Sequence, residues 1–276
     1  MPEGPEIRIA ADRLQAALAD SLASEIYFQF DHLKRFQTKL SHRRITLVEA
    51  RGKAILTHFD CGLAIYSHNQ LYGRWTICRS HETPQSKRQL RLAIRTDLKS
   101  ALLYSATDIE VLTPKQITAH RYLSALGPDV LPEGIEPIRA QLQSSAYRRR
   151  RFGSLFLDQH FIAGIGNYLR SEILFVAGLH PQMRPLDCSA SMLDRLADAI
   201  VAISRQSYRH GGVTNDLDDA AALKAQGKTR NQYRHWVFAR GNEPCRRCDT
   251  RIVEDTAASR RIYFCPVCQP LLTEAF

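Results

Sequence analysis

The sequence predicts an α+β protein of more than one domain, in which an antiparallel β-sandwich with an N-terminal helix precedes a helical domain. The chain has 276 residues, of which 44% are hydrophobic, which is enough to bury more than one core. Short β-rich segments fill its first half, whereas helical periodicity and a cysteine-rich end fill the second. A stretch rich in Pro and Gly lies where this character changes, and we interpret it as a linker.

The N-terminal half combines one helix with many strands. Residues 6–18 carry apolar side chains at three-and-four spacing, and Pro5 suits the first turn of an amphipathic helix. The segments that follow are rich in β-formers and separated by turn or charged residues, at the close spacing of a sandwich or barrel. The expected strands are 24–30, 45–49, 54–59, 63–67, 90–96 and 101–105.

The C-terminal half is expected to be helical. Periodicity predicts helices over residues 137–143, 153–160, 168–177 and 190–204, with Ser189 or Ser191 as the cap of the last. Residues 209–230 are polar and Gly-containing, which indicates a mobile loop, although residues 218–225 could form a short helix. The expected organisation is a β-sandwich domain (1–126), a linker (127–134), a helical domain (135–234) and a cysteine-rich hairpin (235–269).

The chain is strongly basic. Lys and Arg number 38 against 28 Asp and Glu, which gives a formal charge of +10. This excess predicts a polyanionic partner, but charge alone leaves nucleic acid, an anionic membrane surface and a merely basic solvated face open. No window approaches the roughly 20 consecutive apolar residues of a membrane span. The N-terminus is acidic where a secretory signal peptide would be basic, so we expect a cytoplasmic protein with no membrane partner.

Four of the seven cysteines form two close pairs near the C-terminus, Cys245 with Cys248 and Cys265 with Cys268. This spacing is typical of a four-thiolate Zn²⁺ site, and four protein ligands leave no open position, so the zinc is expected to be structural. The alternative is four unrelated buried thiols. Between the pairs, residues 251–254 and 261–264 are expected to form a hairpin. Its tip, 256–260, could aim Arg260 at a ligand.

Two features of the helical half are candidate phosphate-binding sites. The turn around Gly164, Gly166 and Asn167 joins two helical segments, and backbone N–H groups at a helix N-terminus can bind a phosphate oxygen. Asn167 would add a side-chain donor. Simple packing of two helices is the alternative for this turn. The run of arginines at 148–151 is more often a solvated face than a binding site.

The N-terminus has an unusual composition, with two prolines and two carboxylates in a region that usually frays. Composition alone favours a helix start with acidic N-terminal charges. The alternative is catalytic, because removal of Met1 would leave Pro2 with a free secondary amine. An α-amino group is less basic than a Lys side chain, so a useful neutral fraction exists at cellular pH. Such an amine can attack an aldehyde-like carbon, with Glu3 as general acid or base.

Four motifs in this order resemble the formamidopyrimidine-DNA glycosylase and endonuclease VIII family. They are residues 1–6, Arg51-Gly52-Lys53, the turn from Gly164 to Tyr168 and the four-cysteine hairpin, and the resemblance covers roughly residues 1–269. Residues 66–73, Tyr-Ser-His-Asn-Gln-Leu-Tyr-Gly, look like the endonuclease VIII branch. The resemblance implies a catalytic β-sandwich, a helix-two-turns-helix DNA-binding domain and a zinc finger.

The same resemblance implies a base excision repair enzyme, a bifunctional DNA glycosylase and apurinic/apyrimidinic lyase. It would act as a monomer on damaged double-stranded DNA, with one structural Zn²⁺, and flip the oxidised base into a pocket. The purine-selective branch usually has an Arg-Phe-Gly stretch where residues 104–111 read Tyr-Ser-Ala-Thr-Asp-Ile-Glu-Val. Its absence favours oxidised pyrimidines, and β,δ-elimination is expected to leave a one-nucleotide gap.

Roles in catalysis are carried over by motif. Pro2 would be the nucleophile at the sugar C1′, and Glu3 the acid that helps to open the sugar and release the base. Lys53 would act as general acid near the lesion phosphate and assist β-elimination. Arg260 would bind the phosphate and promote δ-elimination, and Glu6 would support the site.

DNA contacts are carried over in the same way. Gln70, Leu71 and Tyr72, here called the wedge, would fill the gap left by the flipped nucleotide, because an apolar side chain and an aromatic face can replace lost stacking. The alternative is a strand end with core Leu and Tyr. Asn167 would contact the same DNA backbone as Arg260.

One position departs from the family pattern. The endonuclease VIII branch commonly has an Arg two residues before Gly127, where this chain has Ala125, and Arg121 could substitute for it. Two rival functions stay open on the residues alone. A catalytically silent zinc protein that binds damaged or structured DNA has no need of Pro2, Glu3 and Lys53 together. A purine-selective glycosylase would share all three.

Overall fold

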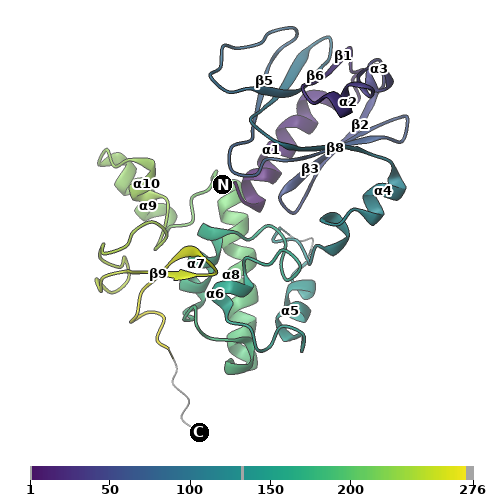
Figure 1. The fold of residues 1–276 in the computed structure, drawn as a ribbon. Coiled ribbons are helices and arrows are strands. Elements are labelled where there is room, and N and C mark those ends of the chain that lie inside the picture. Colours follow the sequence, from purple (N-terminus) through teal and green to yellow (C-terminus); the bar gives the residue numbers. More distant parts are fainter. Residues whose placement is uncertain (1, 132–133, 272–276) are drawn as a thin grey trace. The chain divides into compact units, whose positions relative to one another are not determined.

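The computed structural model describes residues 2–131 and 134–271, which form two compact units (Figure 1). The first unit contains Pro2 and Glu6–Ala125, and the second contains Glu3–Pro5 and the chain from Leu126 onward. Residues 132 and 133 of the predicted linker, and Met1, lie outside the described residues. None of the described helices is both long enough and apolar enough to cross a bilayer.

The first unit is built from two four-stranded antiparallel sheets and the helix α1 (Gly4–Leu18). Their strand orders are β1-β6-β7-β5 and β2-β3-β4-β8. The strands are β1 (Glu25–Phe28), β2 (Ile45–Arg51), β3 (Ala54–Phe59), β4 (Ala64–His68), β5 (Arg74–Arg79), β6 (Leu90–Arg95), β7 (Lys99–Tyr104) and β8 (Asp108–Leu112).

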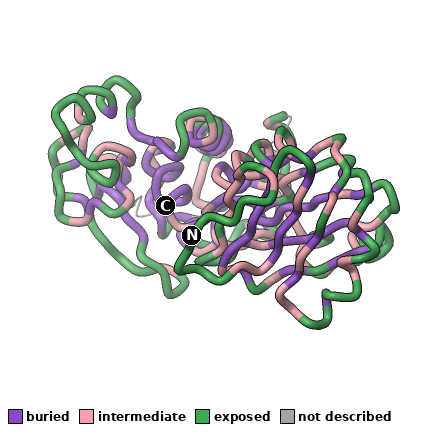
Figure 2. Tube along the Cα trace, turned by 90° about the horizontal axis from the view of Figure 1, so that it is seen from above, coloured by how far each residue is buried: buried purple, intermediate pink, exposed green. Residues whose placement is uncertain are grey.

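One hydrophobic core joins the two sheets to α1. Ile7, Leu14 and Leu18 of the helix pack with Phe28 of one sheet and Ile55 of the other, and these five side chains are almost wholly buried. Figure 2 colours the chain by burial and shows buried stretches along the strands. The predicted antiparallel β fold with an N-terminal helix is therefore confirmed.

The prediction lacks two strands and the short helices of this unit. Both strands carried signals that the prediction did not use, since β5 holds a short run of β-formers between two arginines and β8 alternates acidic with apolar residues. The missing helices are α2 (Asp31–Lys34), α3 (Gln37–Leu40), α4 (Pro114–Ala119) and the 3₁₀ turn η1 (Leu123–Ala125). A capping box of Thr113 and Gln116 marks the start of α4 and was a usable sequence indication.

The second unit is mainly helical. Its elements are α5 (Glu136–Gln143), α6 (Phe152–Leu155), α7 (Asn167–Ala177), the 3₁₀ turn η2 (Pro185–Asp187), α8 (Ala190–Arg209), α9 (Leu217–Ala225) and α10 (Arg230–Tyr233). Helices α7 and α8 supply much of the core of this unit, and α7 is buried on nearly all sides. Ser189 caps α8 by accepting the N–H of Met192 at 3.3 Å.

Two predicted segments of this unit change. The predicted helix 153–160 is wrong in length, because α6 ends at Leu155. The Asp158 side chain accepts the N–H of His160 at 3.0 Å, and such local hydrogen bonds compete with a continuing helix. Within the predicted loop 209–230, the short helix is confirmed as α9, whose cap is Asp216.

The cysteine-rich end forms the predicted hairpin, with strands β9 (Val253–Ala257) and β10 (Arg260–Phe264). Its tip is shorter than the expected 256–260. Only Ala258 and Ser259 connect the strands, with φ values of 51° and 59°. Two consecutive residues with positive φ are typical of a tight two-residue hairpin, so Arg260 is the first residue of β10 rather than part of a loop.

Candidate active site

The four cysteines come together as predicted. Their sulfur atoms all lie within 4.8 Å of one another, with Cys248 and Cys265 3.4 Å apart and Cys245 and Cys268 3.9 Å apart. A tetrahedral Zn²⁺ with Zn–S bonds of about 2.3 Å requires sulfur atoms about 3.8 Å apart, so this donor set fits the ion. Four thiolates would fill its coordination sphere. The zinc therefore has a structural role, which is to fix the base of the β9–β10 hairpin.

Glu3 occupies the N-terminus of α7. Its Oε2 accepts the N–H of Gly166 at 2.7 Å and of Leu169 at 3.2 Å, and its Oε1 accepts the N–H of Tyr168 at 2.8 Å. The residue is only 2% exposed. A helix N-terminus stabilises negative charge, so this site holds the carboxylate in one orientation. Gly166 is required here, because a Cβ atom would lie 2.5 Å from Cδ of Glu3.

This contact corrects one interpretation of the turn. The backbone N–H groups that the sequence assigns to a phosphate oxygen bind an internal carboxylate instead. The physical reasoning about the turn holds, since the helix N-terminus does attract an anion, but the anion belongs to the chain itself. The side chain of Asn167 is separate from this contact, and its predicted role is taken up below.

Lys53 lies in the tight turn between β2 and β3. Gly52 has φ of 59°, which favours glycine, and Lys53 is buried to 6% exposure. The N–H of Lys53 donates to the hydroxyl of Tyr122 at 2.9 Å, which fixes the turn. Nearby, burial lowers the pKa of His68, Asp108 opposes this shift, and the positive charge of Lys53 adds to it.

The wedge protrudes from the end of β4. Leu71 is 56% and Tyr72 is 66% exposed, so the alternative of a core Leu and Tyr is wrong. Gln70 has φ of 50°, and its side-chain oxygen accepts the hydroxyl of Thr107 at 2.6 Å. Two large exposed apolar side chains on a tight loop suit contact with a partner.

The remaining predicted residues are distributed over the two units. Pro2 is partly buried and belongs to the first unit, as does Glu6 in the first turn of α1. Asn167 begins α7 and Arg260 begins β10, both in the second unit. Within the second unit, Arg170 hydrogen-bonds to the side chain of Asn167 and to the backbone of Arg260, so the structure links these two predicted phosphate ligands.

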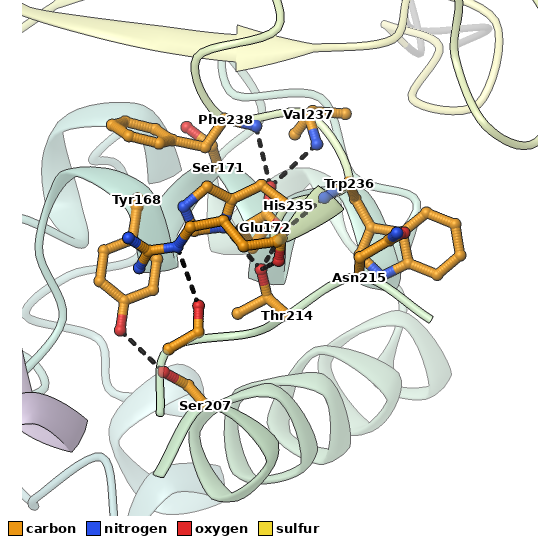
Figure 3. Close-up of polar contacts among 12 residues, drawn as sticks. Tyr168, Ser171, Glu172, Ser207, Thr214, Asn215, His235, Trp236, Val237 and Phe238 are labelled. Carbon is orange, nitrogen blue, oxygen red and sulfur yellow. Dashed lines mark hydrogen bonds and ion pairs between the residues drawn. The ribbon is translucent and has the colours of Figure 1, made fainter. Parts of the chain in front are cut away.

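Sequence reasoning missed a buried carboxylate on α7 (Figure 3). Glu172 is fully buried and accepts the N–H groups of three consecutive residues at 2.8–2.9 Å. These residues are Trp236, Val237 and Phe238. An acidic residue within the apolar sequence of α7 was the available indication, because these three backbone partners lie more than 60 residues away.

A hydroxyl and an imidazole complete this network. Thr214 donates its hydroxyl proton to Glu172, and its oxygen lies 2.8 Å from Nδ1 of His235. A hydroxyl carries one proton, so Nδ1 of His235 is the donor to Thr214 in this arrangement. Burial holds the pKa of His235 well below its ordinary value, and Arg234 and Arg230 add to the effect. His235 is therefore neutral at physiological pH.

Comparison with known proteins agrees with this geometry. Residues 1–108 match the N-terminal domain of formamidopyrimidine-DNA glycosylase, residues 126–218 match its H2TH domain, and residues 242–271 match the zinc finger found in FPG and IleRS. A protein named endonuclease 8 from Escherichia coli is 46% identical over 271 residues, covering 98% of this chain and 100% of that protein. The corresponding protein of Shigella sonnei is 45% identical over the same length.

The chain belongs to the formamidopyrimidine-DNA glycosylase and endonuclease VIII family. Members of this family are DNA glycosylases and AP lyases of base excision repair, so the predictions of the family, of a DNA-repair enzyme and of one structural zinc are confirmed. Among solved structures, Lactococcus lactis Fpg with DNA that contains an abasic site matches with a TM-score of 0.79. It is 22% identical, and the match covers 98% of this chain and 100% of that one. This likeness confirms the fold.

Proposed function

We propose that this enzyme removes oxidised pyrimidines from double-stranded DNA through a Schiff base on Pro2 and then cleaves the strand by β,δ-elimination. The observation that carries the proposal is the fixed position of Glu3. Its carboxylate is held by three N–H groups, and Pro2 is the preceding residue, so a buried anchor limits where the N-terminal amine can lie. Such an anchor has little purpose at a terminus that serves only to start a helix.

The first half of the reaction exchanges the base for the amine. The neutral amine of Pro2 attacks C1′ of the damaged nucleotide, and the bond between C1′ and the base breaks. The base leaves with the proton that the attacking amine loses, and Glu3 supplies the proton that opens the sugar ring at its oxygen. C1′ is then joined to Pro2 as an iminium ion. Glu6, in the first turn of α1, is proposed to support the site.

The second half breaks the strand. The iminium acidifies C2′, so loss of a C2′ proton expels the 3′ phosphate, and a second elimination expels the 5′ phosphate. Water then releases Pro2 and the sugar fragment. Lys53 is proposed to assist the first elimination beside the lesion phosphate. Arg260 and Asn167 are proposed to bind the phosphate whose departure completes the second, because cationic and amide donors stabilise the charge that develops there.

Substrate choice rests on relatives and on the wedge. The endonuclease 8 relatives share 45% to 46% of their residues with this chain, and residues 104–111 lack the Arg-Phe-Gly stretch expected of a purine-selective enzyme. Lactococcus lactis Fpg has been solved with DNA that contains an oxidised pyrimidine. The exposed Leu71 and Tyr72 suit replacement of the stacking lost when a base is flipped.

The deciding experiment is borohydride trapping on duplexes that contain thymine glycol or 8-oxoguanine. The native protein should form a covalent adduct with thymine glycol DNA and yield a one-nucleotide gap, whereas Pro2→Gly should form little adduct. Equal trapping by Pro2→Gly would exclude the N-terminal amine as the nucleophile. Faster excision of 8-oxoguanine than of thymine glycol would favour the purine-selective alternative. Absence of an adduct from the native protein would favour a silent DNA-binding protein.

The proposal extends to organisation and location. We propose domain limits of 1–126, 127–134, 135–234 and 235–269, and a monomer that works in the cytoplasm, associated with the nucleoid when bound to DNA. The formal charge of +10 supports a DNA partner, since phosphate contacts release counterions. Light scattering of the protein with and without a lesion duplex would give the molar mass in solution and so test the proposed monomeric state.

A further inference from the structure

Arg170 on α7 is a fully buried arginine that has no part in the reaction proposed above. Its Nη2 donates to the carbonyl oxygens of Arg260 at 3.0 Å and Arg261 at 2.9 Å. Its Nη1 donates to the carbonyl oxygens of Ala257, at 3.2 Å, and of Gly153. One guanidinium thus holds both strands of the hairpin beside their two-residue tip and joins them to α6.

The same guanidinium orients Asn167. Nη2 of Arg170 donates to Oδ1 of Asn167 at 2.9 Å, one helical turn away on α7. The oxygen and the NH₂ group of an amide point in opposite directions, so this bond directs the NH₂ group of Asn167 away from Arg170. A donor directed in this way is suited to an anionic oxygen.

This arrangement calls for arginine. Burial, and to a smaller extent the charge of Arg260, lower the pKa of Arg170 to about 10, while Glu3 opposes the shift, so the guanidinium stays charged at neutral pH. Its planar set of donors can serve several acceptors at once, which the compact ammonium of lysine cannot do. Placing a cation beside Arg260 is electrostatically unfavourable, which argues for a role beyond packing.

We propose that Arg170 is a positioning residue. It fixes the position of the Asn167 amide relative to the Arg260 side chain, the two groups proposed to bind the DNA phosphate. It acts through the Asn167 oxygen and the carbonyls beside the hairpin tip, and it does not touch DNA itself. The inference rests on the proposed function, because it takes Asn167 and Arg260 as ligands of the DNA backbone. It adds the residue that makes these two ligands act together.

The test compares two buried arginines that receive the same substitution. In Arg170→Lys the charge stays but most of the hydrogen bonds are lost. The matched control is Arg240→Lys. Arg240 is 4% exposed and donates to the carbonyls of Trp236 and Pro244 and to Glu243, all apart from Asn167 and Arg260. Zinc content and thermal unfolding establish that each variant is folded.

The main readout is affinity for a duplex with a tetrahydrofuran abasic analogue, which needs no chemistry. We expect the dissociation constant of Arg170→Lys to rise by at least about tenfold, which corresponds to the loss of one charge-assisted hydrogen bond. The dissociation constant of Arg240→Lys should stay within about twofold of the native value. The dependence of binding on salt should fall by about one to two counterions in Arg170→Lys only. Equal losses in both variants would reduce Arg170 to a structural role and overturn the proposal.

A double-mutant cycle shows whether Arg170 affects DNA affinity through Arg260 or independently of it. If Arg170 positions Arg260, then Arg170→Lys combined with Arg260→Ala should cost much less than the sum of the single changes. Additive losses would overturn the proposal. If Arg170→Lys fails to fold, a double-mutant cycle of Asn167→Ala and Arg260→Ala replaces this test. Two groups held by one guanidinium should lose less affinity together than the sum of the single losses, and additive losses would contradict the proposal. Trapping is measured on thymine glycol DNA, because the tetrahydrofuran analogue cannot form a Schiff base. A native protein that binds the analogue but forms no borohydride adduct with thymine glycol DNA would refute the proposed function alone.

Discussion

Two buried carboxylates of the second unit bind their surroundings in the same way and differ in what lies next to them. Glu3 and Glu172 each accept three backbone N–H groups and are 2% and 0% exposed. Glu172 lies within α7, and its network is closed by Thr214 and His235. Glu3 lies at the beginning of the chain, directly after Pro2. The same contacts therefore stabilise the fold in one case and, under the proposed function, position a reactive chain end in the other.

Exchange of each carboxylate for an amide would separate the two roles. Glu3→Gln keeps the size of the side chain but removes the proposed proton donor, so excision of thymine glycol should fall by about 10²- to 10⁴-fold. Cleavage of a duplex that already contains an abasic site should fall far less, because an abasic sugar is in equilibrium with its open aldehyde and does not need the ring-opening proton of Glu3. Both rates can be measured by gel assay under single-turnover conditions. Equal losses on the two substrates would show that Glu3 serves only to position Pro2.

The matching change at Glu172 should act on stability. In Glu172→Gln, the N–H groups of residues 236–238 face an NH₂ group or an uncharged oxygen in place of the carboxylate. Breaking a buried charged network in this way lowers the free energy of unfolding by about 3–5 kcal/mol. Urea unfolding should show this loss, while excision per folded molecule stays close to the native rate. Glu243→Gln, whose carboxylate is 49% exposed, is the control. A Glu172→Gln protein with native stability would contradict the structural role.

The turn that holds Glu3 can be altered without changing its carboxylate. A Cβ atom at Gly166 would lie 2.5 Å from Cδ of Glu3, so Gly166→Ala should displace the carboxylate and slow excision by about 10²-fold, as misplacement of a catalytic group by about 1 Å can do. The control is Gly134→Ala, where a Cβ atom meets nothing within 4 Å. Native excision by Gly166→Ala would imply that the exact position of Glu3 is unimportant.

The Glu172 network should also make stability depend on pH. The pKa of His235 in the folded protein lies well below its ordinary value, whereas the unfolded chain has the ordinary value of about 6.5. Below about pH 6.5 the unfolded state binds more protons than the folded state does. The contribution of His235 to the free energy of unfolding is therefore fully present above this pH and is lost as the pH falls below it. Thermal unfolding from pH 7.5 to 5.5 should show this trend, and His235→Gln should weaken it. An unchanged slope in that variant would assign the trend to other groups.

Much of the fold could be predicted because it depends on local patterns. The spacing of Ile7, Leu14 and Leu18 defines α1, and the two cysteine pairs define the zinc site. Local patterns failed where a side chain competed with the backbone, as Asp158 does beyond α6. The prediction also omitted β5, although its short run of β-formers between two arginines is compatible with a strand.

The contacts that build the site are less accessible to sequence reasoning. The partners of Glu3 lie more than 160 residues away, so the turn around Gly166 was assigned to an external phosphate. Arg170 was visible only as one more positive charge, because its acceptors are mostly carbonyl oxygens, which every residue has. Residue chemistry and hairpin position pointed to Pro2 and Arg260, and the resemblance to a family added Lys53 and the roles of all three. The contacts that hold Glu3 and the backbone of Arg260 are visible only in the folded structure.

The distance along the chain between Glu3 and its partners has a consequence during synthesis. The carboxylate is translated first, but Gly166 follows 163 residues later, which at ordinary elongation rates is roughly 8 to 33 s. Until then the N-terminal segment lacks the contacts that fix it, and Met1 can be removed by an aminopeptidase. The proposed Pro2 nucleophile requires removal of Met1, and this interval leaves the terminus accessible for that processing before Glu3 is buried.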